Sequence, residues 1–480
     1  MSNLLAMLSN SAAALEAYDQ VLQVSQSNVA NASTPGYAKQ RLPLEALPFD
    51  PAQGLPGGVE TGTMQSSRSE YAEQAVRRQT TALGYQQQAA TSLTALQAIF
   101  DISGTTGIPY ALSQFYQSVS TWGQNVDSAA ARQTVLEDAS NVAQTFQSTA
   151  TAVQNLTSDT ETQLKNTVDQ VNKLVGQIQG YNQFILQSGS AAHDAGMDAQ
   201  VHAALENLSS LVDFTAVQQS DGTTSILLNG RTPLLSEDQQ YQITAGLVMP
   251  DDPVNPNGAP TMQLLASDGT DITAQTAGGQ LGALLDMRNR ILPSISGDAT
   301  QTGDLNRMAQ QFADRVNEIF TNGEISDNPQ VPGVPLFQYD ATNLTATAKT
   351  LAVDPTVTTD QLAAIDPGPP YVGNGVPLDL AALAQPGTDA DRIDGVSYTQ
   401  FYGNIASNVG SQLQAAQDGQ QVQQSLVAQA QNQRQQLSGV SLDEEAMTLV
   451  EFQRAYEANS KFISVLDQLM QDTLNILGTS

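Results

Sequence analysis

The sequence predicts a mainly α fold with inserted β structure: a long-helix bundle or coiled coil built from both chain termini, plus a small β-rich outer domain. Two observations lead to this prediction. Apolar residues recur at helical spacing over long stretches at both ends and through much of the middle, and short β-branched runs separated by turn residues interrupt them. A chain of 480 residues is long enough for several domains and a sizeable core.

The first helix is expected over residues 1 to 33. Its apolar positions recur at spacings of three, four or multiples of these: Leu4, Leu8, Leu15, Tyr18, Leu22 and Val29. The sequence Thr34-Pro35-Gly36-Tyr37 should end this helix, because proline lacks the backbone donor and glycine accepts the left-handed cap. Residues 42 to 68 are dense in Pro and Gly and predict an extended connector.

Long helices are expected next, from about residue 70 to 100 and from about 109 to 188. The clearest heptad-like pattern comprises Leu164, Val168, Val171, Val175, Ile178 and Ile185. Asp221-Gly222 lies between two β-branched runs and predicts a hairpin. The expected domains are a terminal coiled coil (1-41 and 442-480), a helical bundle (42-211, 276-322 and 396-441) and the β-rich outer domain (212-275 and 323-395).

The final helix should begin at a capping box formed by Ser441 and Glu444, with Asp443 and Glu445 also at the positive helix end. Its apolar seam includes Leu449, Phe452, Tyr456, Ile463, Leu466 and Leu469. A seam of roughly 50 Å needs a partner in water. The two termini are each other's nearest candidates, and identical copies in a tubular array would cover the rest. Terminal helices that pack only within one monomer fit the periodicity equally well.

The composition limits the classes of function. Acidic residues outnumber basic ones by 48 to 18, giving a formal net charge of -30, so nucleic acid and anionic membranes are poor partners for the whole molecule. The absence of cysteine excludes disulfides and cysteine nucleophiles. The first 38 residues lack Lys and Arg, and the chain has no membrane-length apolar run, so neither a cleavable secretory signal nor a membrane span is expected.

Both chain ends carry recognisable motifs. Ser27-Asn28-Val29-Ala30-Asn31 and the stretch from Thr34 to Arg41 stand at one end, and Asp443-Glu444-Glu445 and the stretch from Phe452 to Lys461 at the other. This pair of signatures resembles that of the bacterial flagellar axial proteins of rod, hook and hook–filament junction. Tyr37-Ala38-Lys39-Gln40, Gly439-Val440-Ser441-Leu442 and residues 208 to 235 favour the hook-associated branch. Val29, Ala38 and Lys39 depart mildly from the family pattern.

The resemblance implies an extracellular structural subunit of the flagellar hook–filament junction, exported by the flagellar type III apparatus and needed for flagellum assembly and motility. It implies four kinds of partner: further copies of the chain, the hook protein, the second junction protein with flagellin on the filament side, and a cytoplasmic export chaperone that binds the C-terminal helix. We predict that the apolar seam residues named above form the subunit contacts, together with Asn28, Asn31, Thr34, Pro35, Gly36 and Tyr37.

Particular roles follow for the last group. Asn28 and Asn31 should satisfy the last helical carbonyls or bridge to neighbours, and Tyr37 should pack the junction between the helix and the connector. The Thr34-Pro35-Gly36-Tyr37 stop should fix where the helix ends, and the connector should let the chain turn outward to a second layer.

Two alternatives remain. A hook or distal-rod protein would share both terminal helices, and a secreted metal-dependent hydrolase would need His193 or His202 as a ligand. His202 lies four residues before Glu206, on one helical face, but no third ligand stands at a suitable spacing. No phosphate loop, Gly-x-Ser-x-Gly or His-Glu-x-x-His motif occurs. The sequence therefore predicts no enzyme, no catalytic residue, no cofactor and no metal site.

Overall fold

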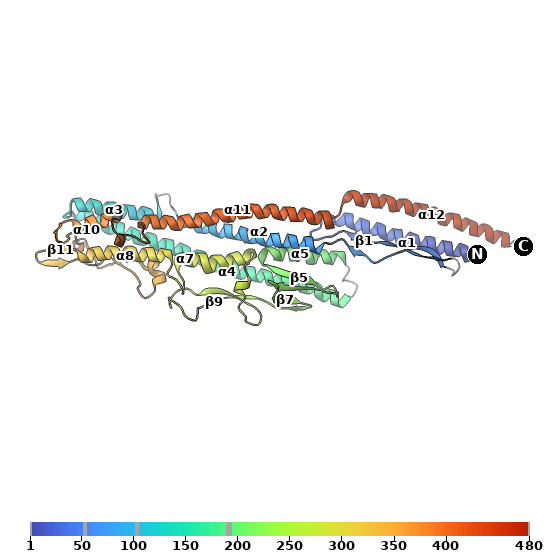
Figure 1. Cartoon of the computed structure of the whole chain (residues 1–480), viewed down its shortest axis with the longest axis horizontal. Coiled ribbons are helices and arrows are strands. Elements are labelled where there is room, and N and C mark those ends of the chain that lie inside the picture. The colour runs from blue at the N-terminus through green and yellow to red at the C-terminus, as the bar shows by residue number, and fades with distance from the viewer. Residues whose placement is uncertain (1, 51–54, 101–104, 189–193, 479–480) are drawn as a thin grey trace.

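The computed structural model describes residues 2–50, 55–100, 105–188 and 194–478 and shows an elongated molecule with both termini at one end (Figure 1). The predicted fold class is confirmed. The five longest helices are α1 (Ser2–Asn31), α2 (Glu70–Gln97), α4 (Ala129–Ser188), α11 (Tyr398–Ser438) and α12 (Leu442–Gly478). Shorter helices are α3 (Gly107–Gln124), α5 (Ala195–Leu211), α6 (Gly279–Asp286), α7 (Leu292–Ser296), α8 (Asp304–Asn322), α9 (Thr347–Thr350) and α10 (Gly375–Ala382).

A large apolar core lies at the end of the molecule away from the termini. There α3, the first half of α4, α8, α10 and α11 bury the large aromatic side chains. Phe312 stands at its centre, with its ring centroid 5.9 Å from that of Phe115 and 5.6 Å from that of Tyr398. Trp122 stacks on Phe320, and both are fully buried. Such aromatic contacts add directional preference to area burial.

A second core forms around the C-terminal half of α4. All six heptad-like residues predicted there are buried, and all but Ile185 pack in one cluster with α5, α6 and the adjoining strands. The sheet has the order β5-β6-β7-β8, with β5 (Phe214–Gln218), β6 (Thr224–Leu228), β7 (Thr232–Ser236) and β8 (Gln239–Gln240). β9 (Thr244–Val248) pairs with β10 (Thr261–Leu265). The hairpin predicted at Asp221-Gly222 is confirmed as the antiparallel pair β5–β6.

The two β segments expected to form one outer domain pack into different cores, although Asn257 of the first donates to the Thr342 carbonyl of the second at 3.0 Å. Residues 212–275 belong to the second core, whereas β11 (Glu324–Asp327), β12 (Gln330–Pro332), β13 (Phe337–Gln338) and β14 (Ala352–Val353) lie at the far end (Figure 1). The reason is burial: Leu336, Phe337 and Leu351 pack into the aromatic core. The segment 323-395 therefore adds to the core of the helical bundle, and its grouping with 212-275 in one outer domain stays a prediction.

The connector after α1 also differs from a simple extended passage. β1 (Gln40–Arg41) pairs with β4 (Gln65–Ser66), and between them β2 (Leu44–Asp50) and β3 (Leu55–Thr61) form an antiparallel hairpin. The hairpin lies along α1, where the Thr61 hydroxyl donates to Gln20 Oε1 at 3.1 Å. The expected outward turn is therefore replaced by a hairpin that runs back along the helix. No helix in the described parts of the chain has the length and apolar character needed to cross a membrane.

Candidate functional site

The two terminal helices form an antiparallel pair with a fixed register. Asn459 donates to the carbonyl of Ser11 at 2.7 Å, the Tyr18 and Phe452 rings lie 5.8 Å apart, and Ser25 donates to Glu445 Oε2 at 2.6 Å. These contacts recur every seven residues along both helices, the repeat of a coiled coil. One further step reaches the level of Leu4 and Leu466, where Leu466 is only 4% exposed.

This register explains where the predicted seam residues lie. Leu466 is buried, and the following are half-buried: Leu4, Leu8, Leu15, Tyr18, Leu22, Leu449, Phe452 and Ile463. Val29, Tyr456 and Leu469 are exposed. Val29 lies beyond the level at which α12 begins, and Leu469 lies level with the start of α1, so neither faces a full turn of the opposite helix. That these residues contact other subunits stays a prediction.

A second apolar stripe on the pair has no partner among the described residues. Its members on α12 include Met447 at 65% exposure, Phe462 at 47% and Val465 at 55%, and on α1 Leu5 is 57% exposed. When α1 and α12 pair, each helix therefore covers only one side of the other, and the second stripe stays exposed. The sequence analysis named Leu469 but not Phe462 or Val465, because it followed a single seam, although the three- and four-residue steps that connect these residues are readable.

We call α1, α12 and the β2–β3 hairpin the terminal arm, and the rest of the molecule the body. Gly36 lies where the two meet. Its φ of +77° is a left-handed conformation, and a Cβ built there would stand 2.2 Å from the carbonyl oxygen of Ala199 on α5. Only glycine permits both the turn and this close approach. Thr34 and Pro35 are exposed on the same turn.

Asn28 and Tyr37 hold the end of α1 against the chain that follows. The Asn28 amide donates to the carbonyl of Gln40 at 2.9 Å, and its Oδ1 accepts from the Gln40 amide at 3.0 Å and from the Tyr37 hydroxyl at 3.0 Å. Burial raises the pKa of Tyr37. Of the two roles expected for Asn28, satisfying the last helical carbonyls or bridging to neighbours, its bonds to Gln40 show a bridge, made to β1 of the same chain. Asn31 does donate to a helical carbonyl, that of Ser27 at 2.9 Å.

Lys39, the first basic residue of the chain, ties the start of α12 to the end of α1. Its Nζ lies 2.8 Å from Glu444 and 3.1 Å from Glu445, whose side chain is 3% exposed. Burial disfavours the ammonium, but the two carboxylates outweigh burial and raise the pKa of Lys39. The Lys39 amide also donates to the carbonyl of Ser438, the last residue of α11, at 2.9 Å.

Arg68 connects the arm to the body. Its guanidinium donates to the carbonyl of Gly36 at 2.6 Å, to Glu73 at 2.7 Å and to Asp198 at 2.6 Å. Arg434 of α11 reaches the same Glu73 at 3.2 Å. The side chains of Arg68 and Glu73 are 9% and 4% exposed. Because a charge that loses its partner in such a buried network is costly, the network fixes the four segments relative to one another.

Arg434 also reaches α5 by an ion pair with Glu206 at 2.7 Å. We call the residues that connect the arm to the body the joint. They are Gly36, Lys39, Arg68, Glu73, Asp198, Glu206, Arg434, Glu444 and Glu445. The sequence analysis did not identify Arg68 or Arg434. The one clue to them in the sequence is that basic residues are scarce, with 18 in the chain, and that these two lie near helix ends.

The residues proposed for a metal site do not form one. His202 is buried in the joint, where its Nε2 lies 3.5 Å from Asp198. Burial and the nearby arginine charges lower the pKa of His202 to about 2, and the same charges would repel a cation. Glu206 is engaged by Arg434, and His193 lies outside the described residues. Among the residues that the structure describes, no three His, Cys, Asp or Glu side chains are grouped to hold a metal ion.

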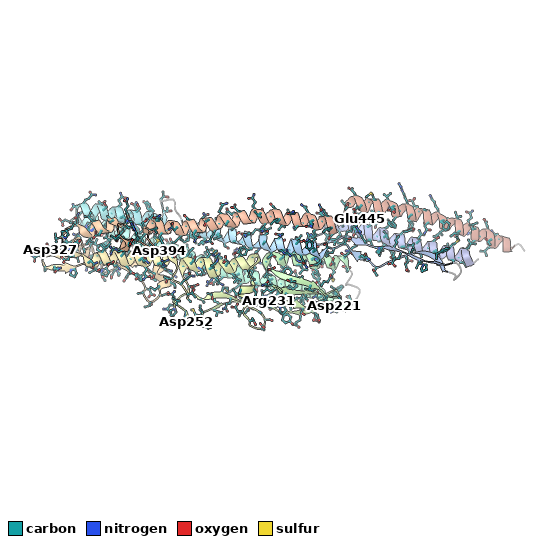
Figure 2. All side chains as sticks on the ribbon, viewed as in Figure 1. Asp221, Arg231, Asp252, Asp327, Asp394 and Glu445 are labelled. Carbon is teal, nitrogen blue, oxygen red and sulfur yellow. The ribbon has the colours of Figure 1, made fainter. Side chains whose placement is uncertain are left out.

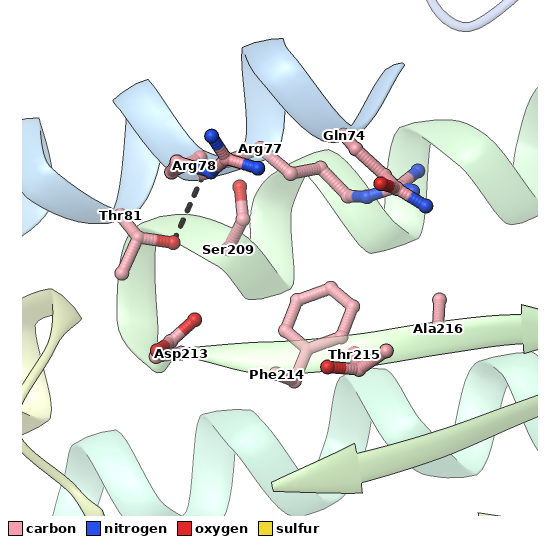
Figure 3. Close-up of a pocket in the computed structure, with 9 residues that line it drawn as sticks. All are labelled: Gln74, Arg77, Arg78, Thr81, Ser209, Asp213, Phe214, Thr215 and Ala216. Carbon is pink, nitrogen blue, oxygen red and sulfur yellow. Dashed lines mark hydrogen bonds between the residues drawn. The ribbon is translucent and has the colours of Figure 1, made fainter. Parts of the chain in front are cut away.

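A small pocket lies beside the joint, between α2, the end of α5 and β5 (Figure 3). Its volume is about 200 Å³, and its lining includes Arg77, Arg78, Ser209 and Asp213. The Arg77 guanidinium pairs with Glu70, and the Thr81 hydroxyl donates to the Arg77 carbonyl at 3.0 Å. The titratable lining of this pocket comprises Arg77, Arg78 and one carboxylate, Asp213.

Comparison with known proteins agrees with this architecture. The family model described as "Flagellar hook-associated protein FlgK helical domain" matches residues 93–337, a little over half of the chain. The model "Flagellar basal body rod FlgEFG protein C-terminal" matches residues 431–476, the end of α11 and nearly all of α12.

Relatives match along the whole length. Flagellar hook-associated protein 1 of Bacillus subtilis is 25% identical, with 97% of each chain covered. Flagellar hook-associated protein 1 of Escherichia coli is 21% identical, with 98% of this chain and 99% of the relative covered. The structure of the flagellar hook junction protein FlgK from Burkholderia pseudomallei superposes with a TM-score of 0.63 at 15% identity, covering 76% of this chain and 99% of that one. The chain therefore belongs to the FlgK family of flagellar hook-associated proteins.

Proposed function

We propose that this chain is a structural subunit of the hook–filament junction, which self-assembles through its terminal arm into a tubular layer. As a member of its family it is part of the external bacterial flagellum. The observation that carries the self-assembly proposal is the second apolar stripe of the arm. Phe462, Val465 and Leu469 remain about half exposed although α1 and α12 are already paired.

Burial of this stripe supplies the driving force for assembly. Each large apolar side chain gains about 1.5–3 kcal/mol when it is fully buried. Several such residues on each arm, repeated around a ring, outweigh the entropy lost on association. A helix pair presents the stripe along its whole length, so parallel stacking of arms from neighbouring copies covers it.

The joint gives the assembly its geometry. Arg68 and Arg434 bind Glu73 from opposite sides, and Gly36 seats the end of α1 against α5. The arm is therefore held at a set angle to the body. When arms stack in a tube, this angle dictates where each body lies, so a uniform layer of bodies forms outside the stacked arms.

The partners follow from the place of such a layer. The hook protein lies on one side of it, and the second junction protein with flagellin lies on the other. Before export, an uncovered stripe of this size favours aggregation. A cytoplasmic chaperone that covers α12 prevents this aggregation until the subunit passes through the type III apparatus.

A hook or distal-rod subunit is the competing function, because residues 431–476 match a rod-protein model. The match of residues 93–337 to the hook-associated helical domain favours the junction. Immunogold labelling distinguishes the two: we expect label at the distal end of the hook, and label along the hook or in the rod would assign the chain elsewhere.

Deletion of the gene tests the function directly. We expect hooks to persist while filaments are lost, and full-length protein to restore filaments. Replacement of Phe462 and Leu469 by Glu should fail to restore them, whereas Glu at Val217, which is 42% exposed on β5, should succeed. Filaments that form in the deletion strain, or an arm variant that restores them fully, would refute the proposal.

A further inference from the structure

Charge is distributed unevenly over the body. α11 contains only two charged residues in 41, Asp418 and Arg434, and Arg434 is taken up by the joint. α3 contains none, and α2 contains none after Arg78. In a chain with 66 charged residues and a net charge of -30, a helix of this length with one free charge is unusual.

The other side of the body is acidic. α11 packs on α2, α2 packs on α5 and α6, and the β5–β10 strands lie beyond these helices. Figure 1 accordingly shows α3 and α11 along one long edge and β5, β7 and β9 along the opposite edge. Asp221 and Asp252, labelled in Figure 2, lie on this second edge, and Asp251, Asp268 and Asp271 are exposed in the same segment.

The uncharged side also exposes apolar residues. We call the exposed residues of α11 between Asn404 and Leu437 the neutral face. Val422 is 57% exposed, Leu426 36% and Leu437 54%, and exposed Gln and Ser side chains lie between them. α12 follows α11 along the same edge of Figure 1, and its first turns expose Leu442 at 57% and Met447 at 65%.

Electrostatics selects what can cover this face. Two copies of a strongly acidic chain repel each other, and an exposed carboxylate is expensive to bury without a partner. A face of glutamine, serine and aliphatic side chains with a single exposed carboxylate, Asp418, keeps both costs low. Residues 404–437 span about 50 Å of a helix that is about 10–12 Å wide with its side chains, an area of roughly 500–600 Å². With the adjoining exposed residues of α12 this area approaches the roughly 800 Å² per partner of a stable interface.

We propose that the neutral face of α11 is the contact between the bodies of neighbouring copies in the assembled layer, while the acidic β side faces outward. This inference rests on the proposed function, because the occupant is a second copy of this chain. The exposed residues at the start of α12, along the same edge, support the choice, since a copy stacked on the arm is already placed beside α11.

Matched charge additions test the proposal in the full-length protein. The first variant carries Val422→Glu and Leu426→Glu on the neutral face. The control carries Val254→Glu and Leu247→Glu on the acidic side, where the native residues are 73% and 43% exposed. Both variants add two negative charges at exposed aliphatic positions. A third variant, Phe462→Glu with Leu469→Glu, disables the arm.

Filament number per cell in the deletion strain, and sedimentation of purified protein over a concentration series, provide the readouts. We expect the neutral-face variant to form about tenfold fewer filaments and to associate about tenfold more weakly in sedimentation. The control should stay within about twofold of the native protein in both measurements, and all variants should melt within a few degrees of it. Gln429→Glu with Gln433→Glu adds the same charge isosterically at exposed positions, so it gives the answer if the first variant melts early.

The outcomes separate the two proposals. If both neutral-face variants assemble like the control while the arm variant fails, the neutral face is not a copy–copy contact and the proposed function stands. If the arm variant also assembles, the proposed function itself is wrong. Equal losses in the neutral-face variants and the acidic-side control show a general charge effect and overturn the inference.

Discussion

The terminal arm and the far end of the body solve the problem of burying apolar surface in opposite ways. In the body, Trp122, Phe115 and Phe312 are fully buried by residues of the same chain. In the arm, by contrast, the apolar side chains of Phe462 and Val465 on α12 are about half exposed. The far end of the body thus buries its large apolar side chains within one chain, whereas the arm leaves apolar surface exposed, as the self-assembly proposal requires.

We expect hydrogen exchange in the purified monomer to show the largest difference between the arm and the body. We expect the amides of α1 and α12 to exchange at least about a hundredfold faster than those of α3 and α8, because the arm opens without exposing the aromatic core. Mass spectrometry of exchanged peptides at low protein concentration measures the difference. Equal protection in arm and body would remove the contrast.

Truncation of one aromatic side chain in each region comes next. Phe312→Ala should cost about 3–5 kcal/mol of unfolding free energy, because it opens a cavity in a filled core. Phe462→Ala should change the monomer by less than about 0.5 kcal/mol and still weaken assembly. Urea denaturation measures the first quantity, and sedimentation measures the second. A large monomer effect at Phe462 would mean that the arm is covered in the monomer.

Removal of Arg68 separates the regions from each other. Arg68→Gln leaves Glu73 and Asp198 short of a partner, and breaking a buried ion pair costs about 3 kcal/mol. We expect the body to melt earlier because its α2–α5 contact weakens, and the arm to swing because Arg68 no longer binds the Gly36 carbonyl. X-ray scattering in solution should then report a broader range of molecular lengths. Arg290→Gln, which removes an exposed pair with Asp286, is the control.

Substitution of Gly36 acts on the same joint with a smaller effect. Gly36→Ala forces a Cβ onto the Ala199 carbonyl, so we expect a loss of about 1–3 kcal/mol in arm docking. Gly395→Ala provides the matched control, because its φ of +79° is nearly the same but a Cβ there meets nothing within 4 Å. Only the difference between the two variants reports packing on α5, and equal effects would indicate backbone strain alone.

The effect of pH on the joint should be the smallest. Lys39 lowers the pKa of Glu444 below 4.5, so this contribution is present above pH 4.5 and is lost as pH falls through the folded value. The pKa of Lys39 is raised above 10.5, so its contribution is lost only as pH rises beyond that value. Arm docking should hold between these limits, and Lys39→Gln should flatten the acid limb in a fluorescence or scattering titration.

The sequence predicted where the helices lie along the chain better than it predicted how they pack against other segments. α1, α2, the heptad face of α4, and α12 follow from periodicity, because each buries one continuous stripe. The split between α3 and α4 at Asn125–Ser128 and the return of the connector along α1 depend on packing against other segments. The placement of residues 323–395 escaped prediction for the same reason, since Leu336 and Leu351 are ordinary apolar residues until a core is available.

At the candidate site the terminal motifs pointed to the right segments but not to the contacts. Gly36 and Tyr37 were singled out because a Pro-Gly stop is a local signal. Arg68 and Arg434 are separated by more than 360 residues, and no local pattern connects them to the Glu73 that they share. Asn28 was expected to act within its helix or to bridge to neighbours, and its partner is set by how β1 folds back.

The register of the arm also acts as a check on finished chains. Ser25 and Glu445 are 420 residues apart in sequence, so α1 cannot find its companion until the ribosome has made nearly the whole polypeptide. A product that stops early has α1 without α12, so it lacks the paired arm through which we propose that copies assemble. Under that proposal, the meeting of the two chain ends excludes incomplete molecules from the tubular layer.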